Sequence, residues 1–142
     1  MEATLGGVAG TMPLPRQDAP SSAVIPAGGR VIERDYTNRA GTRAYKLYIL
    51  SGYVDQAVPL VVMLHGCTQH PDNFANGTHM NALAEEYTFL VAYPTQAQNA
   101  NMSKCWNWFQ AADQQRGQGE PSLIAGIMCE AVGEYNVDPG RV

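Results

Sequence analysis

The segment Leu60-Val61-Val62-Met63-Leu64-His65-Gly66-Cys67-Thr68-Gln69 decides how this chain is interpreted. Its five consecutive apolar residues are typical of a strand that is buried on both faces of a parallel sheet. His65-Gly66 then indicates a sharp turn at the carboxyl end of that strand, which is where open α/β sheets bind ligands. A backbone N–H in such a turn can donate to a substrate oxygen, so the turn is a candidate half of an oxyanion hole.

Length and composition indicate one globular domain with its own core. The chain has 142 residues, of which 45% are hydrophobic and 15% are charged, and its formal net charge is −4. No cluster of Lys and Arg is present, which disfavours a nucleic-acid partner. No apolar run approaches the roughly 20 residues that span a bilayer, and residues 1–6 show neither the basic nor the apolar region of a secretory signal.

Hydrophobic periodicity around the opening segment predicts strands that alternate with helices. The expected elements, in order, are a tail or linker at 1–29, strands at 31–36 and 43–50 joined by a turn at 38–42, a strand at 59–64, a loop at 70–73, a helix that begins near Asn76 or Thr78, a strand at 89–94, a helix from Pro121 to Tyr135, and the start of another strand at 141–142. This order predicts an α/β fold with an antiparallel start and parallel strands after it.

The first expected helix carries Met80, Leu83, Ala84 and Tyr87 on one stripe, which predicts the face that it buries. In the second expected helix, Cys129 is interpreted as a buried apolar residue. No Cys-x-x-Cys pair occurs in the sequence, so no metal site is expected.

Seven segments, taken together and in this order, resemble the poly(3-hydroxybutyrate) depolymerase-type esterases. They are 59–69, 74–78, 80–86, 89–94, Cys105-Trp106-Asn107-Trp108-Phe109, 119–124 and 135–142. The resemblance covers roughly residues 43–142 and implies an α/β-hydrolase fold, of which residues 30–142 form the N-terminal part of the catalytic domain. It further implies hydrolysis of polyhydroxyalkanoate or short-chain esters by a Ser-His-Asp triad, without a cofactor.

The nucleophile that the resemblance implies is missing from the sequence. The serines, none of which lies in Gly-x-Ser-x-Gly, are Ser21, Ser22, Ser51, Ser103 and Ser122. In the family this elbow follows the segment that ends here at Arg141-Val142, and the acid and the histidine of the triad come later still. We therefore expect a fragment that ends before the elbow, supplies the backbone N–H of Cys67 to the oxyanion hole, and is inactive alone.

Cys67 and Cys105 both flank the expected site. They either form a disulfide, whose long enclosed loop would restrict the unfolded chain, or remain reduced thiols, which a cytoplasmic location would favour. The resemblance to the family implies an extracellular location. A third alternative makes Cys67 a thiolate nucleophile, but this needs a histidine base, and His65 lies too close along the turn to be well oriented. His70 and His79 are the other candidate bases, and both are expected to be surface residues. His65 is instead expected to shape the turn.

Substrate contacts are expected from the polar loop that contains the two tryptophans. Trp106 and Trp108 are expected to provide at least one contact to an apolar or aryl group, with Trp106 preferred, although either could instead close the core. Gln69 and Asn107 are weaker candidates for hydrogen bonds near the site. The charged residues expected on a solvated loop face are Asp113, Arg116 and Glu120.

Two functional alternatives remain open at this point. A feruloyl or acetylxylan esterase would share these motifs and differ in its substrate pocket. If instead the 142 residues were a complete product, the chain would be a catalytically dead binding domain that uses its tryptophan loop. The oligomeric state is also left open by the sequence.

Overall fold

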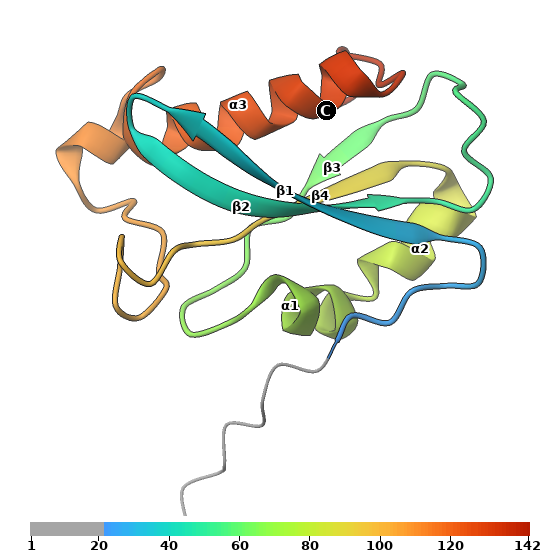
Figure 1. Ribbon diagram of the computed structural model, residues 1–142, viewed down its shortest axis with the longest axis horizontal. Coiled ribbons are helices and arrows are strands. Elements are labelled where there is room, and N and C mark those ends of the chain that lie inside the picture. Colours follow the sequence, from blue (N-terminus) through green and yellow to red (C-terminus); the bar gives the residue numbers. More distant parts are fainter. Residues whose placement is uncertain (1–21) are drawn as a thin grey trace, which may run out of the picture.

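The computed structural model describes residues 22–142, which form one mixed β-sheet with helices on both faces (Figure 1). The elements are the strands β1 (Arg30–Asn38), β2 (Gly41–Ile49), β3 (Leu60–Val62) and β4 (Leu90–Pro94), the helices α1 (Pro71–Thr78), α2 (Met80–Tyr87) and α3 (Gly119–Glu134), and the 3₁₀ helix η1 (Ala111–Gln114). The strand order is β1-β2-β4-β3. β2 pairs antiparallel with β1 and β4, and β3 pairs parallel with β4, so the expected antiparallel start is confirmed.

The β1–β2 hairpin turns where the sequence predicts. Asn38 pairs with Gly41, and the Asn38 side chain accepts a hydrogen bond of 2.7 Å from the backbone N–H of Ala40. Gly41 has a φ of +135°, a backbone conformation that residues other than glycine rarely adopt. The turn is therefore local in origin, which explains why the sequence alone could locate it.

β3 is shorter and less buried than its apolar sequence predicts. Leu60 is buried, but Val61 and Val62 are half-buried and Leu64 is 41% exposed. The reason is position, because β3 pairs with β4 on one side and lies at the edge of the strand order. On its other side, residues 136–141 form backbone hydrogen bonds with Val58 and with Leu60 at its beginning, such as Leu60 N–H to the Arg141 carbonyl at 3.0 Å. The prediction of a strand buried along its whole length was therefore wrong.

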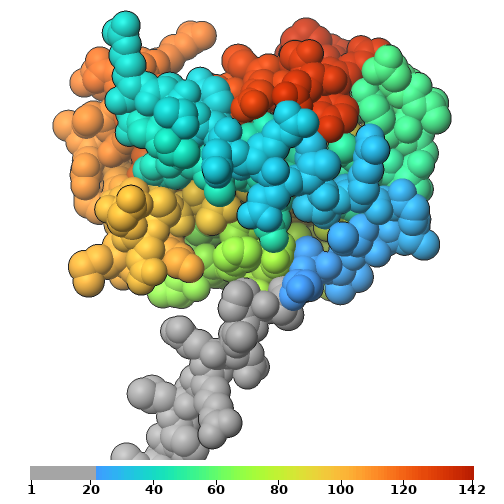
Figure 2. All heavy atoms as spheres, viewed as in Figure 1, coloured from blue at the N-terminus to red at the C-terminus, as the bar shows by residue number. Residues whose placement is uncertain are grey.

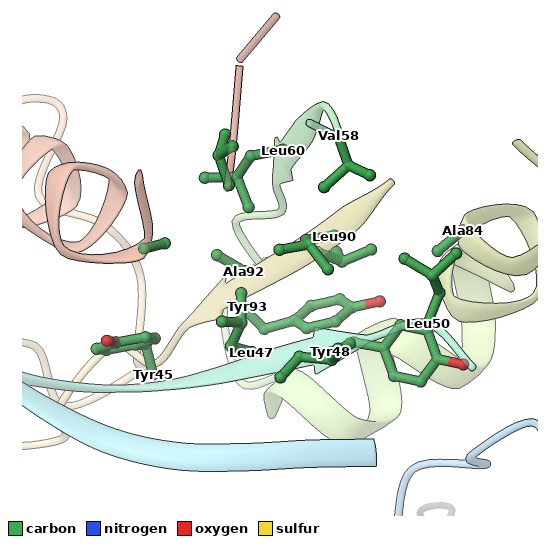
Figure 3. Close-up of a cluster of buried hydrophobic side chains, with 14 of the residues drawn as sticks. Tyr45, Leu47, Tyr48, Leu50, Val58, Leu60, Ala84, Leu90, Ala92 and Tyr93 are labelled. Carbon is green, nitrogen blue, oxygen red and sulfur yellow. The ribbon is translucent and has the colours of Figure 1, made fainter. Parts of the chain in front are cut away.

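The centre of the core is β4, whose five residues are all buried. Side chains of β2, β3 and β4 meet there, including Leu47, Leu60 and Leu90 (Figure 3). This matches the apolar run at 89–94, which predicts a fully buried strand. β4 is consequently the rigid element from which the following loop is positioned.

Two short helices replace the single helix that the sequence predicts between β3 and β4. α1 begins at Pro71, and the ring Nδ1 of His70 caps it by accepting from Asp72 N–H at 3.3 Å. The helical conformation is then interrupted at His79, which has a φ of +55°. The predicted loop at 70–73 was therefore wrong, because Pro71 occupies the first helical position that proline favours.

The buried face of α2 also differs from the predicted stripe. Ala84 is buried, as expected, but Leu83 is 37% and Tyr87 is 66% exposed. The inward position is taken by Asn81, whose side chain accepts a hydrogen bond of 2.7 Å from the Tyr93 hydroxyl. The apolar periodicity predicts the wrong buried face of α2, because the polar residue Asn81 has a buried hydrogen-bond partner, Tyr93, on β4.

α3 covers the opposite face of the sheet from α1 and α2 (Figure 1). It begins at Gly119, so Pro121 lies in its first turn, and Leu123 and Ile127 are fully buried as predicted. A Cβ at Gly126 would lie 2.1 Å from the Tyr36 ring, so only glycine fits this contact. α3 therefore packs closely on β1 and fixes the end of the loop that precedes it.

Cys129 lies on α3 but away from the buried face. The structure leaves it as an exposed free cysteine, so its assignment to the core was wrong. The buried positions 123, 127 and 131 follow an i, i+4 spacing, and residue 129 falls outside that stripe.

The predicted tail lies only partly within the described residues, since residues 1–21 lie outside them. Residues 22–29 contact α1 and α2: Val24 N–H donates to the Asn76 side chain of α1 at 2.7 Å, and the Val24 carbonyl accepts from the Asn81 side chain of α2 at 3.4 Å. Within residues 22–142, no helix has the length and apolar character that crossing a membrane requires.

Candidate functional site

Two loops meet beyond the carboxyl ends of the parallel strands β3 and β4. The loop after β3, residues 63–70, leads to α1 on one face, and the loop after β4, residues 95–118, leads to α3 on the other face (Figure 1). Neighbouring strands whose loops leave toward opposite faces form a topological switch point, where α/β sheets bind ligands. The loops touch here, because Thr68 N–H donates to the Ser103 carbonyl at 2.7 Å. The loop after β4 forms one end of the molecule (Figure 2).

A disulfide between Cys67 and Cys105 joins these two loops. The two Cα atoms lie 4.2 Å apart, and 38 positions of sequence separate the residues. The sequence left both the bonded and the reduced state open, and the structure has the bonded state. A sulfur in a disulfide is not a thiolate, so the structure contradicts the alternative in which Cys67 is the nucleophile.

The four successive backbone N–H groups of residues 66–69 differ in their partners. Gly66 N–H donates to Gln69 Oε1 at 2.7 Å, and Gln69 N–H donates to the Gly66 carbonyl at 3.3 Å. Thr68 N–H is bonded to Ser103, as described above. Cys67 N–H donates to no group within residues 22–142, and Cys67 is exposed. Its amide is therefore the one member of this turn that is available to a ligand among the described residues.

His65 holds the peptide that carries this free N–H. The side chain is 2% exposed, and its Nε2 accepts from Gln96 N–H at 3.0 Å. Nδ1 then carries the proton and donates to the Gly66 carbonyl at 2.7 Å. The Gly66 carbonyl and the Cys67 N–H belong to one trans peptide and point in opposite directions. Fixing the carbonyl therefore also fixes the direction of the N–H.

His65 is expected to stay neutral in this position. Burial lowers the pKa of His65, the hydrogen bond to the Gly66 carbonyl opposes this shift, and the charge of Lys104 adds to the lowering. A protonated ring could not accept from Gln96 N–H, so the neutral form is the one that fits both hydrogen bonds.

A buried polar network supports the loop after β4. Its centre is Glu120, which is 6% exposed and accepts from Asn107 N–H at 2.9 Å, from the Asn107 side chain, and from Gln96 Nε2 at 2.6 Å. Arg43 Nη2 lies 3.6 Å from the same carboxylate, and Arg43 Nε donates to Gln96 Oε1 at 2.8 Å. The expectation that Glu120 is solvated was therefore wrong, because the first turn of α3 directs it into the protein.

The two tryptophans have different surroundings. Trp106 is half-buried, its Nε1–H donates to the His65 carbonyl at 3.1 Å, and its ring centroid lies 5.7 Å from that of His65. Trp108 is 73% exposed and forms an edge-to-face pair with Phe109 at 5.9 Å. Trp106 thus secures the loop, whereas Trp108 presents an apolar surface to solvent.

The two weaker candidates for substrate contact are engaged in the protein. Asn107 is 6% exposed, and its side chain also donates to the Ala100 carbonyl at 3.2 Å and accepts from Asn101. Gln69 is exposed, but its Oε1 already accepts from Gly66 N–H. Both side chains therefore shape the loops, and Asn107 presents no surface to a ligand.

Sequence reasoning missed Arg43 and Gln96. Gln96 follows the end of the buried strand β4 by two residues, at the position from which an α/β fold builds its site. Arg43 is a charged residue in β2, a strand that ends in the three buried residues Leu47, Tyr48 and Ile49. Both features were visible, but nothing local in the sequence connects them with Glu120.

Residues 43–142 match the family described as Esterase PHB depolymerase. The chain is 38% identical to poly(3-hydroxyalkanoate) depolymerase C of Paucimonas lemoignei over 106 residues, which are 75% of this chain and 25% of that protein. It is 33% identical to feruloyl esterase B of Neurospora crassa over 84 residues, which are 58% of this chain and 28% of that protein. The chain therefore spans about a quarter of the length of the curated relatives that it matches.

The fold is shared with solved structures of low sequence identity. An S-formylglutathione hydrolase from Agrobacterium tumefaciens superposes with a TM-score of 0.60 and 14% identity, over 82% of this chain and 48% of that chain. A ferulic acid esterase superposes with a TM-score of 0.55 over 77% of this chain. These likenesses establish the α/β-hydrolase fold of the chain.

Proposed function

The chain belongs to the PHB depolymerase family of esterases, and on that premise we propose that it is the part of a carboxylic ester hydrolase that supplies one oxyanion-hole donor. The observation that carries the proposal is the Cys67 N–H, which is without a partner in residues 22–142 while the neighbouring N–H groups are bonded. The donor lies at the switch point of the sheet, on a turn held by His65 and by the disulfide.

The proposed reaction uses a serine that is not among these 142 residues. A histidine accepts the serine proton as the serine oxygen attacks the ester carbonyl, and negative charge develops on the carbonyl oxygen. Cys67 N–H donates to that oxygen and stabilises the charge. The alcohol then leaves with the proton, and water hydrolyses the acyl-enzyme by the same steps. Loss of one such donor typically costs about 3–4 kcal/mol of transition-state stabilisation.

We propose that the ester is a hydroxyalkanoate polyester or a short-chain ester. The Trp108–Phe109 pair supports this, because an exposed aromatic pair in the loop that carries Cys105 can pack on an apolar polyester chain. A feruloyl or acetylxylan ester is the second candidate, supported by the relatedness to feruloyl esterase B. The same aromatic pair would then contact an aryl acyl group.

We further propose that the protein acts outside the cell. The support is the Cys67–Cys105 disulfide, because such bonds persist in oxidising compartments and are rare in the cytosol.

The experiment compares the 142-residue chain with the product of the whole reading frame that encodes it. We expect that frame to contain Gly-x-Ser-x-Gly after Val142, and its product to hydrolyse p-nitrophenyl butyrate until a fluorophosphonate blocks it. The 142-residue chain should show no hydrolysis above buffer. Turnover by this chain that a fluorophosphonate blocks would contradict the proposal, as would a reading frame without the elbow. Hydroxybutyrate oligomers, methyl ferulate and acetylated xylan then separate the substrate classes.

A further inference from the structure

A small hollow lies at the switch point, between the two loops that the disulfide joins. Its volume is about 210 Å³, and it is lined by Thr68 from the loop after β3 and by Gln98, Met102, Ser103 and Lys104 from the loop after β4. Thr68 directly follows Cys67, so the hollow adjoins the proposed oxyanion donor. It is smaller than the roughly 300–1,000 Å³ of common ligand pockets. It therefore suits a single small acid group.

The polar side chains of the hollow have donors that the protein does not use. The Lys104 ammonium forms no ion pair or hydrogen bond within residues 22–142, and the side chains of Gln98 and Ser103 donate to no group in that range. The Thr68 hydroxyl, in contrast, donates to the Cys67 carbonyl at 2.6 Å. An ammonium accompanied by neutral donors is complementary to a carboxylate, whose oxygens only accept.

The charge around the hollow also favours an anion. None of its lining residues is acidic, although the whole chain carries a net charge of −4. The charge of Lys104 also acts on His65, which precedes Cys67 by two residues. Burial is the largest cause of the lowered pKa of His65, and the Lys104 charge lowers it further. Met102, which is 87% exposed, adds an apolar wall for an alkyl group.

We propose that this hollow is a subsite for a carboxylate, with Lys104 as its cation. The ligand class is a small hydroxy acid, either the acid released by hydrolysis or the free carboxyl end of a linear oligoester. The choice of this class rests on the proposed function, whereas carboxylate binding itself requires no turnover. Loss of binding with ester hydrolysis intact would overturn the subsite alone.

The test is a titration of the ¹⁵N-labelled 142-residue chain, followed by NMR. Sodium 3-hydroxybutyrate and its linear dimer are added separately, and methyl 3-hydroxybutyrate serves as the neutral control. We expect saturable shifts of the Thr68, Ser103 and Lys104 amides with both acids and at least about tenfold weaker binding of the methyl ester, as for loss of a charge-assisted hydrogen bond. Tighter binding of the dimer identifies the chain end as the ligand, and equal binding identifies the acid.

Variants separate this site from general attraction of anions. Lys104→Gln should weaken acid binding by about tenfold or more, and Lys104→Arg should retain most of it. Arg30→Gln removes the same charge from β1, at the far edge of the sheet, and should leave binding unchanged. Equal binding of acid and methyl ester, equal shifts with sodium sulfate, or Lys104→Gln binding like the unmodified chain would overturn the proposal. Dispersed spectra of both Lys104 variants verify that they are folded.

Discussion

Replacement of Glu120 by Gln is expected to lower the free energy of unfolding by about 3–5 kcal/mol, the usual cost of removing one partner of a buried ion pair. Arg43 Nη2 lies 3.6 Å from this carboxylate, and both side chains are less than a tenth exposed, so the Arg43 charge would lose its buried partner. The carboxylate also accepts from Asn107 and from Gln96. An amide at residue 120 places an NH₂ group against these donors, which adds to the cost.

The assay is urea unfolding followed by circular dichroism, with Glu86→Gln as the matched control. Glu86 is exposed on α2, so the same change of charge there should alter the free energy of unfolding by less than about 0.5 kcal/mol. The double variant Arg43→Met with Glu120→Leu should be more stable than Glu120→Gln, because no charge then stays buried alone. A Glu120→Gln chain within about 1 kcal/mol of the original would refute the view that Glu120 is the centre of the network.

Three further predictions concern stability. Reduction of the Cys67–Cys105 disulfide should lower the free energy of unfolding by about 4 kcal/mol, from the chain entropy of a loop closed across 38 positions; an unchanged urea midpoint in reductant would contradict this. The pKa of His65 is lowered in the folded state, so neutral His65 contributes fully to the free energy of unfolding above its unfolded pKa of about 6.5. This contribution is lost as the pH falls through the folded pKa, by up to about 1.4 kcal/mol per pH unit. His65→Asn should flatten this pH dependence in unfolding curves between pH 7 and 4. Gly126→Ala should destabilise by about 1–3 kcal/mol through overpacking, whereas Gly133→Ala, with open space around it, should be neutral or stabilising; similar melting temperatures for the two variants would argue against the close contact of α3.

The elements that the sequence predicts well are those determined by their own residues. The strand at 89–94 is apolar throughout and is buried in the centre of the sheet as β4. The turn before Gly41 depends on an Asn side chain and a glycine within four residues. Both depend on local chemistry, so an isolated sequence is sufficient to locate them.

The elements that the sequence predicts poorly depend on contacts with distant residues. His79 interrupts a helical pattern by adopting a positive φ, for which its neighbours in sequence give no signal. Asn81 is buried because Tyr93, on another strand, donates to it. β3 is less buried than its composition suggests because its burial is decided by which segments lie beside it.

The site shows the same division. The turn after β3 was foreseeable, because an apolar strand followed by His-Gly is a local signature of such a turn, whereas the role of Cys67 in it stays a proposal. Glu120 was mistaken for a surface residue because its partners, Arg43 and Gln96, lie 77 and 24 positions away in the sequence. Trp106 was preferred over Trp108 as a substrate contact, yet only folding shows that Trp106 bonds to the His65 carbonyl and that Trp108 is exposed.

Replacement of the Cys67 N–H by an ester oxygen is the sharpest test of its proposed role in stabilising an oxyanion. The replacement is made by semisynthesis in the catalytically competent product of the whole reading frame, and kcat and KM are measured with p-nitrophenyl butyrate. We expect kcat to fall by about 10²–10³ while KM changes little, because the hydrogen bond strengthens as negative charge develops. A loss of kcat of less than about threefold, far smaller than the loss expected when an oxyanion-hole donor is removed, would contradict this role of the Cys67 N–H.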